Sequence, residues 1–188
     1  MLLDHLPDQS TLELKLGGRF QFHGLIGPTP SPPPTLLHYI WAYRRRRHGF
    51  EQGVEASNAQ DLVPYGTDVS VLEALLRLQT LQGVPPGKKL ATTGEELQSV
   101  IREVDPQVNL STFELLTSLH RLMGAVYQVV QPKPYYWSLG FRLINSLDVT
   151  LPRMGSKETL REIKLELSET TLHLHTSGNL TTWPHEYW

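Results

Sequence analysis

The chain contains no cysteine in 188 residues. Without a thiol it can form no disulfide, no thiolate metal site, no iron–sulfur cluster and no cysteine nucleophile. A small secreted domain held together by disulfides is therefore excluded as well. We expect the protein to reside in the cytoplasm, with the nucleus as the alternative.

Long apolar runs and a strong net charge are also lacking. The first eight residues have neither a basic segment nor a continuous apolar stretch, so no secretory signal is expected. The longest nearly uncharged stretches, such as 123–131, are too short to span a membrane. A net charge of −2 creates no overall attraction to nucleic acid or anionic lipid, so any such contact must be local.

The motifs of common enzyme classes are missing too. The chain has no G-x-S-x-G, H-E-x-x-H, G-x-G-x-x-G or EF-hand pattern. His173 and His175, two residues apart near His185, could in principle share a metal, but we interpret them as exposed residues of a strand. We predict no metal, no cofactor and no enzyme. Because catalytic triads are defined by geometry, a hydrolase or transferase without a recognisable motif stays an alternative, with His120 as the histidine expected nearest the core.

Alternating apolar residues predict strands near both ends of the chain. Leucines alternate with polar residues over 12–16 and phenylalanines over 20–22, and Gly17-Gly18 between them suits a hairpin turn. Apolar residues occupy odd positions over 135–151, which predicts two strands with a turn or bulge near Asn145-Ser146. Alternation over 163–167 and 172–174 predicts a final hairpin around 168–170.

The middle of the chain carries helix signals. Aromatic and aliphatic residues from Thr35 to Arg47 predict one helix, followed by a loop over 50–66. Three more helices follow, each opening with a hydroxyl residue and a glutamate three positions later and each ending before a proline. Their opening pairs are Ser70 and Glu73, Thr93 and Glu96, and Ser111 and Glu114, and the last helix is expected to continue to Gln131.

This order of elements predicts an α+β fold. An antiparallel sheet would be built from the N-terminal and C-terminal hairpins, with about four helices from the middle of the chain packed on one face. With 39% hydrophobic residues, the chain can bury the core of a single domain over residues 1–188. The proline-rich segment Pro28–Pro34 would be a stiff internal spacer.

Four consecutive arginines, Arg44–Arg47, followed by His48, are the most conspicuous local feature. Such a run can neutralise phosphates of nucleic acid or bind an anionic membrane surface. The alternative is a solvated helix end, where arginines favourably complement the helix dipole. We predict that this cluster contacts an anionic partner.

Aromatic residues and prolines provide candidate protein contacts. Trp and Tyr dominate hot spots between proteins, and Pro30 and Pro33 have the spacing of a peptide ligand for an aromatic groove. The candidate contact residues are Trp41, Tyr136, Trp183, Tyr187, Trp188, Pro30 and Pro33. A homo-oligomer or a protein partner is therefore expected.

Two functional interpretations follow besides the enzyme. The order of hairpin, proline segment, aromatic helix and basic cluster, over about a quarter of the chain, resembles small matrix proteins of negative-strand RNA viruses. That resemblance implies a non-enzymatic, self-assembling protein, although here a strand begins by Thr11 where matrix proteins commonly have a disordered arm. The alternative is an RNA- or DNA-binding regulatory or accessory factor, against which the near-neutral charge counts.

Overall fold

The computed structural model describes residues 26, 39–47, 50–58, 63–133, 137–152 and 159–177. The elements in chain order are β1 (Tyr39–Arg47), β2 (Phe50–Asn58), α1 (Asp68–Leu81), β3 (Leu90–Thr92), α2 (Gly94–Val104), α3 (Thr112–Gly124), β4 (Ala125–Lys133), β5 (Trp137–Arg142), β6 (Ile144–Thr150), β7 (Glu162–Leu167) and α4 (Glu169–Ser177). The predicted α+β class is confirmed.

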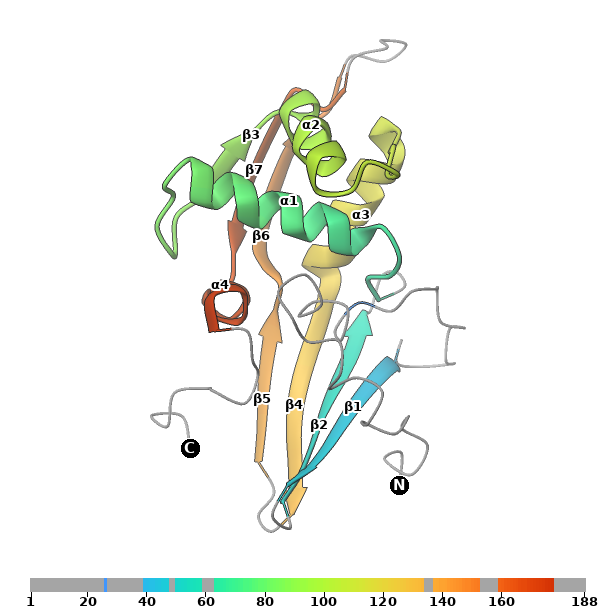
Figure 1. Ribbon diagram of the computed structural model, residues 1–188, viewed down its shortest axis with the longest axis vertical. Helices are drawn as coiled ribbons and strands as arrows, with labels where there is room; N and C mark the ends of the chain where they lie inside the picture. Colours follow the sequence, from blue (N-terminus) through green and yellow to red (C-terminus); the bar gives the residue numbers. More distant parts are fainter. Residues whose placement is uncertain are drawn as a thin grey trace.

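The strands form two antiparallel sheets where we expected one. β1-β2-β4-β5 make a four-stranded sheet, here called the blade, and β3-β7-β6 make a three-stranded sheet. Figure 1 shows the three-stranded sheet together with α1, α2 and α3 at one end of the molecule, here called the head, while the blade extends to the other end. The predicted N-terminal hairpin lies outside the described residues.

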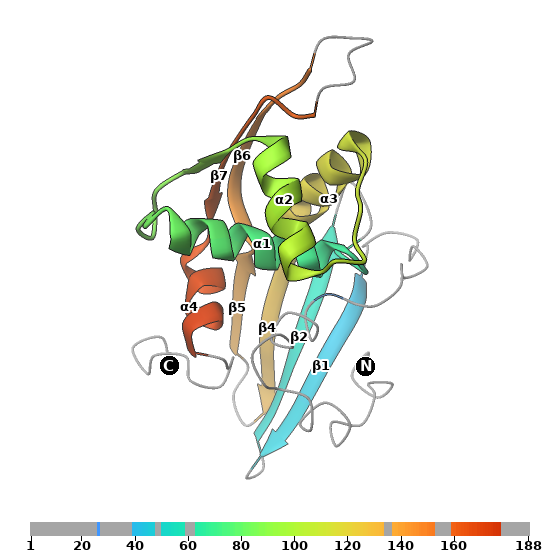
Figure 2. The ribbon, with the colours of Figure 1, turned by 45° about the horizontal axis from the view of Figure 1, so that its top comes forward.

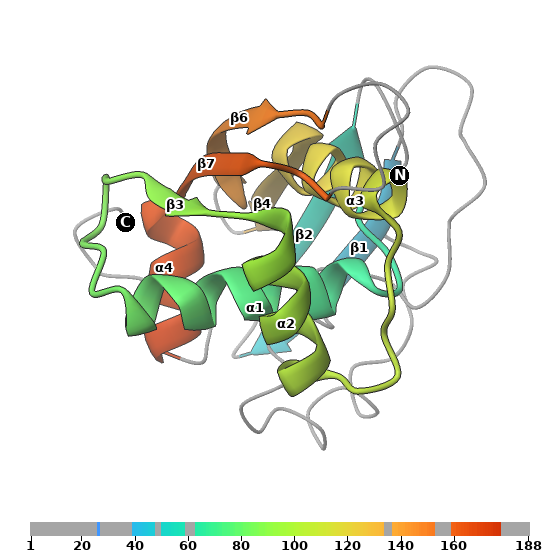
Figure 3. The ribbon, with the colours of Figure 1, turned by 90° about the horizontal axis from the view of Figure 1, so that it is seen from above.

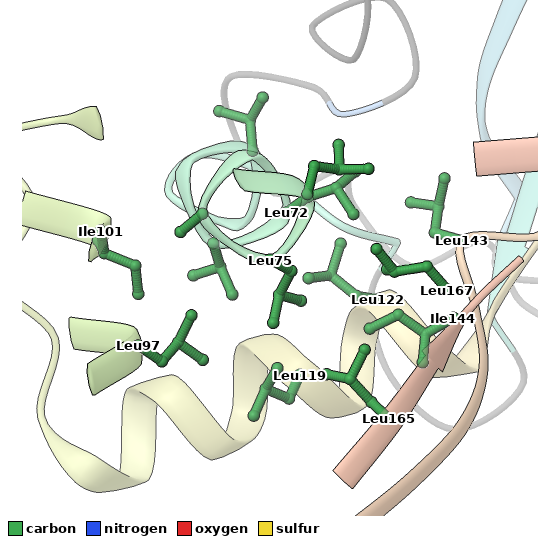
Figure 4. Packing of buried hydrophobic residues seen from close by; sticks show 14 of the residues in the cluster. Leu72, Leu75, Leu97, Ile101, Leu119, Leu122, Leu143, Ile144, Leu165 and Leu167 are labelled. Carbon is green, nitrogen blue, oxygen red and sulfur yellow. The ribbon is translucent and has the colours of Figure 1, made fainter. Parts of the chain in front are cut away.

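The core is centred on α1. The apolar residues of this helix cover most of its circumference, and the helix is accordingly buried on almost all sides. Figure 4 shows its Leu72 and Leu75 between the apolar faces of α2, α3 and the three-stranded sheet. The core continues into the base of the blade, where the rings of Tyr127 and Phe141 stack across β4 and β5 with their centroids 5.5 Å apart.

Two of the three predicted helix starts are confirmed as caps. The hydroxyls of Thr93 and Ser111 accept hydrogen bonds from the backbone N–H groups of Glu96 and Glu114, at the starts of α2 and α3. The expected start at Ser70 is wrong. α1 begins at Asp68, and the buried Ser70 hydroxyl instead donates to the carboxylate of Asp105, 3.2 Å away.

The expected helix over Thr35–Arg47 and the loop after it are also wrong. Residues 39–47 form β1, which pairs with β2 in the segment that we had interpreted as a loop. Aromatic and β-branched residues such as Tyr39 and Ile40 favour strands once a partner strand is present. Because β2 lies between β1 and β4, its backbone is paired on both sides despite its weak sequence pattern.

The C-terminal end of α3 is a further correction. The helix stops at Gly124, and Ala125–Lys133 form β4 where we expected helix to Gln131. Val126, Tyr127, Val129 and Val130 have the side chains that favour strands. A short apolar run of this kind does not by itself distinguish a strand from a buried helix.

The C-terminal strands agree in part with expectation. β5, β6 and β7 lie within the predicted strand segments, and the break between β5 and β6 is at Leu143, with an irregular register between Ile144 and Ser146. The expected last strand is instead α4. Its start is capped by the hydroxyl of Ser168, which accepts from the N–H of Thr171 at 3.0 Å. The Thr171 hydroxyl anchors this end of α4 to the carbonyl of Leu143.

Candidate nucleic-acid interface

The helices α2 and α3 lie in the head and are joined by residues 105–111. This connection is held to its surroundings at both ends. Asp105 accepts the Ser70 hydroxyl of α1, and the side-chain amide of Gln98 in α2 donates to the carbonyl of Leu110 at 2.9 Å. Figure 2 shows α1 crossing in front of the strands with α2 and α3 beside each other above it.

α3 has two unlike faces. One face packs into the core through Leu115, Ser118, Leu119 and Leu122. The opposite face carries Phe113, Thr117 and His120, spaced by four and three residues so that they line up along the helix. We call these three residues the outer stripe of α3.

The outer stripe faces solvent. The side chain of Phe113 is 75% exposed, His120 is exposed and Thr117 is partly exposed. An exposed phenylalanine among neutral polar residues contributes nothing to the core. The stripe is therefore free to contact a partner.

The N-terminal end of α3 is held by a complete capping box. The Ser111 hydroxyl accepts from the N–H of Glu114 at 3.2 Å, and the carboxylate of Glu114 accepts from the N–H of Ser111 at 2.7 Å. Hydrogen bonding of the Glu114 carboxylate to the side chain and to the backbone N–H of Ser111 holds the pKa of this carboxyl below its usual value. The first turn of α3, which presents Phe113, is thereby fixed in position.

We expect Ser111→Ala to lower the free energy of unfolding by about 1 kcal/mol, because the variant loses this cap. The pKa of Glu114 should rise towards its usual value, which NMR titration of the carboxyl group can follow. Since the folded-state pKa is the lower one, the carboxylate favours folding at neutral pH and this contribution disappears as the pH falls through that pKa. An unchanged Glu114 pKa in the variant would contradict the capping box.

The C-terminal end of α3 is fixed to α1 by an ion pair. Arg121 donates from Nε and a terminal nitrogen to the two carboxylate oxygens of Asp68, both at 2.8 Å. The Asp68 side chain is fully buried, and it also accepts from the backbone N–H of Tyr65 at 2.9 Å. The guanidinium lies over the ring of Tyr65. Burial and the Asp68 charge raise the pKa of nearby Tyr127 far above its usual value.

The N-terminal end of α2 contacts the start of β7. The N–H of Gly94 donates to the carbonyl of Leu160 at 2.7 Å. A Cβ atom at position 94 would lie 2.7 Å from the backbone nitrogen of Leu160, so glycine permits this close approach. Figure 3 shows β6 and β7 next to α3, seen from above. The connection between these two strands therefore starts and ends beside the helix pair, with Leu151 57% exposed at its start.

The head has the element order of a known supersecondary arrangement. Its elements follow the order helix, strand, helix, helix, strand, strand, and its sheet has the order β3-β7-β6. This is the topology of a winged helix-turn-helix. In it α2 and α3 are the helix-turn-helix pair, α3 holds the place of the recognition helix, and the connection between β6 and β7 stands where the wing would be in chain order.

Two features depart from the simplest winged helix. The connection between α2 and α3 has seven residues, Asp105–Ser111, instead of the usual three or four. The hairpin β4–β5 is inserted between α3 and β6, and it brings the head into continuous contact with the blade.

Comparison with known proteins supports the fold alone. No family model and no curated protein matches the chain. Two crystal structures of domains 2 and 3 of RctB are similar in fold. One has a TM-score of 0.57 and 17% identity over 91% of this chain and 65% of that one. The other has a TM-score of 0.55 and 15% identity over 83% of this chain and 59% of that one. The chain thus spans about two thirds of those structures or less.

The structure brings few of the predicted site residues together. Arg44–Arg47 and Trp41 lie on β1 in the blade, not on a helix, whereas the outer stripe belongs to α3 in the head (Figure 1). His48, Tyr136, Trp183, Tyr187, Trp188, Pro30 and Pro33 lie outside the described residues.

The two histidines expected on one face of a strand lie in a helix instead. His173 and His175 lie in α4, where residues two apart point to different sides. In the part of the chain that the structure describes, no group of three His, Asp or Glu side chains is placed to hold a metal ion. His120 was expected near the core and is exposed instead.

The outer stripe of α3 was missed by the sequence analysis. The signal available was the succession of two helices capped by Thr93 and Ser111. Only seven residues separate the end of the first helix from the start of the second. That succession favours a helix-turn-helix pair. Which side of the second helix faces solvent could be inferred only after the true end of α3 was known.

Proposed function

We propose that this protein binds double-stranded DNA, with α3 in the major groove. The proposal depends on one observation: α3 occupies the recognition position of a winged helix-turn-helix and presents a side-chain stripe with no part in the core. A B-DNA major groove admits one α-helix, whose outward side chains then reach base edges.

The chemistry of the outer stripe suits contact with bases more than with phosphates. The ring of Phe113 can contact a thymine methyl group, and the imidazole of His120 can hydrogen-bond to a base edge. The Thr117 hydroxyl donates to the carbonyl of Phe113 at 2.8 Å, so towards a base edge it can act as an acceptor. Arg121, the one Lys or Arg in α3, is already paired with Asp68. We therefore expect α3 to contribute more to sequence preference than to electrostatic attraction.

The proposed function agrees with one of the two binding interpretations from the sequence, the nucleic-acid-binding factor. The other, a self-assembling matrix-type protein, stays a prediction, because most of its aromatic contact residues lie outside the described segments. Among the described residues, no helix is long and apolar enough to cross a membrane. The absence of enzymatic activity also stays a prediction.

We expect Phe113→Ala to weaken binding to a selected duplex by about 5- to 150-fold, equivalent to about 1–3 kcal/mol for a lost base contact. The duplex would be obtained by selection from a random-sequence pool with the wild-type protein, and affinity measured by fluorescence anisotropy. Because Phe113 is exposed, folding stability should change little.

Leu81→Ala is the matched control for this experiment. Leu81 is 68% exposed at the end of α1, so its replacement removes a similarly exposed apolar side chain from another surface. Equal affinities of the two variants for the selected duplex, or failure of the wild type to enrich any sequence, would refute the proposed function.

A further inference from the structure

The far end of the blade gathers most of the positive charge of its strands. In the register of β1 and β2, Arg44–Arg47 lie opposite Gly53–Phe50. In the register of β2 and β4, Glu51 lies opposite Lys133, the last residue of β4. Arg46 is therefore separated from Lys133 only by Glu51 on the strand between them. We call Arg44–Arg47 with Lys133 the basic tip.

The basic tip and the head carry charge of opposite sign. The five cations of the basic tip and the carboxylate of Glu51 together carry +4. The described residues of the head, 63–124, 144–152 and 159–167, contain ten Asp or Glu and seven Lys or Arg, which gives −3. Among these, α2 carries the exposed carboxylates of Glu95, Glu96 and Glu103. Phosphates are thus attracted to the tip and repelled by much of the head.

The distance from α3 to the tip matches a length of DNA. β4 starts at Ala125, directly after α3 ends at Gly124, and runs for nine residues to Lys133. At about 3.3 Å per residue this strand spans roughly 30 Å. One turn of B-DNA is about 34 Å long, so a contact of α3 and a contact of the tip would lie close to one helical turn apart.

We propose that the basic tip is a second DNA contact, binding phosphates of the same duplex about one turn away from the site of α3. This inference depends on the proposed function of the head. Electrostatic attraction and base recognition, the two tasks of a DNA-binding protein, would then lie at opposite ends of one molecule. The tip supplies the sequence-independent attraction that the acidic head lacks, and α3 supplies the base contacts.

The experiment is the salt dependence of duplex binding by two double variants, Arg44→Gln/Arg46→Gln and Arg45→Gln/Arg47→Gln. Residues two apart on a strand share a face, so each variant removes two charges from one face of β1. Each lost phosphate contact lowers the slope of log affinity against log salt by about 0.9. For the face that meets the duplex we expect a slope smaller by about 2, with the preferred sequence unchanged.

Lys88→Gln/Lys89→Gln is the charge-matched control. Both lysines are exposed in the connection between α1 and β3, and the variant changes the net charge by the same amount. It should leave the salt slope within error of the wild type. If the control reduces the slope as much as the arginine variants do, the effect is one of net charge and the second contact is refuted.

Duplex length provides the independent readout. On a duplex of about 12 base pairs with the α3 site at its centre, only about 6 base pairs remain on each side, which is less than one turn. There the wild type should show the reduced slope of the arginine variants. On a duplex of about 30 base pairs, the salt slopes of the wild type and of the arginine variants should differ. A wild-type slope that is the same on both lengths would overturn the proposal, as would arginine-dependent binding to phosphatidylserine vesicles without any length effect on DNA.

The two proposals fail in different ways. If Phe113→Ala weakens binding while neither arginine variant alters the salt slope, the head binds DNA and the tip does not. If the arginine variants reduce the slope while Phe113→Ala and Leu81→Ala behave alike, the tip binds DNA and the role of α3 is wrong.

Discussion

Asp68→Ala is expected to lower the free energy of unfolding by about 3–5 kcal/mol, the cost of breaking a buried ion pair from one side. The carboxylate is fully buried and accepts three hydrogen bonds, two from Arg121 and one from the N–H of Tyr65. Its removal leaves a guanidinium only 12% exposed without its counter-charge. It also leaves the N–H of Tyr65 without its acceptor.

Chemical denaturation of single and double variants tests this expectation. Asp68→Leu/Arg121→Met removes both charges and leaves no buried ion unpaired, so it should be less destabilised than Asp68→Ala. Glu103→Ala is the control, because its ion pair with Arg77 is about half exposed on both sides and should contribute less than about 1 kcal/mol. A loss below about 1 kcal/mol in Asp68→Ala would show that the pair has no structural role.

The ion pair also bears on the proposed function. Arg121 is next to His120 of the outer stripe, and Asp68 is in the first turn of α1. The pair therefore sets the orientation of α3 relative to the rest of the head. A variant that keeps its fold but frees Arg121 should bind the selected duplex less specifically, because the stripe is no longer held in one position.

Gly94→Ala is expected to destabilise the protein by about 2–3 kcal/mol, combining overpacking with a weakened hydrogen bond. The added methyl group would meet the backbone nitrogen and oxygen of Leu160 at 2.7 and 3.0 Å. Backbone atoms cannot rotate away as a flexible side chain does. The start of α2 and the start of β7 must therefore separate, which lengthens the bond between the Gly94 N–H and the Leu160 carbonyl.

Alanine variants at two other glycines should destabilise the protein less, which gives a graded series. A Cβ atom at Gly124 would meet the buried Asn58 side chain at 2.9 Å, so Gly124→Ala should have an intermediate effect. At Gly140 the nearest atom is 3.9 Å away, so Gly140→Ala should change stability by less than about 1 kcal/mol. Thermal unfolding of the three variants gives the order, and a tolerated Gly94→Ala would contradict the close approach.

Sequence alone predicted the elements whose signals are local. The hydroxyl–glutamate pairs at Thr93 and Ser111 identified two helix starts, because a cap acts on N–H groups within the next turn. The alternation over 163–167 identified β7, because the period of a half-buried strand is visible in its own residues. The α+β class follows from elements of this kind.

Tertiary structure decided the form of those segments whose hydrogen-bond partners lie far away in the sequence. β1 became a strand because β2 pairs with it, and β2 because β4 lies on its other side, although neither partner is visible within the segment itself. The end of α3 at Gly124 and the separation into two sheets arose in the same way. Caps and alternation act between residues a few positions apart, whereas sheet pairing and burial join residues far apart in the sequence. The outer stripe of α3 could therefore be identified only from the folded structure.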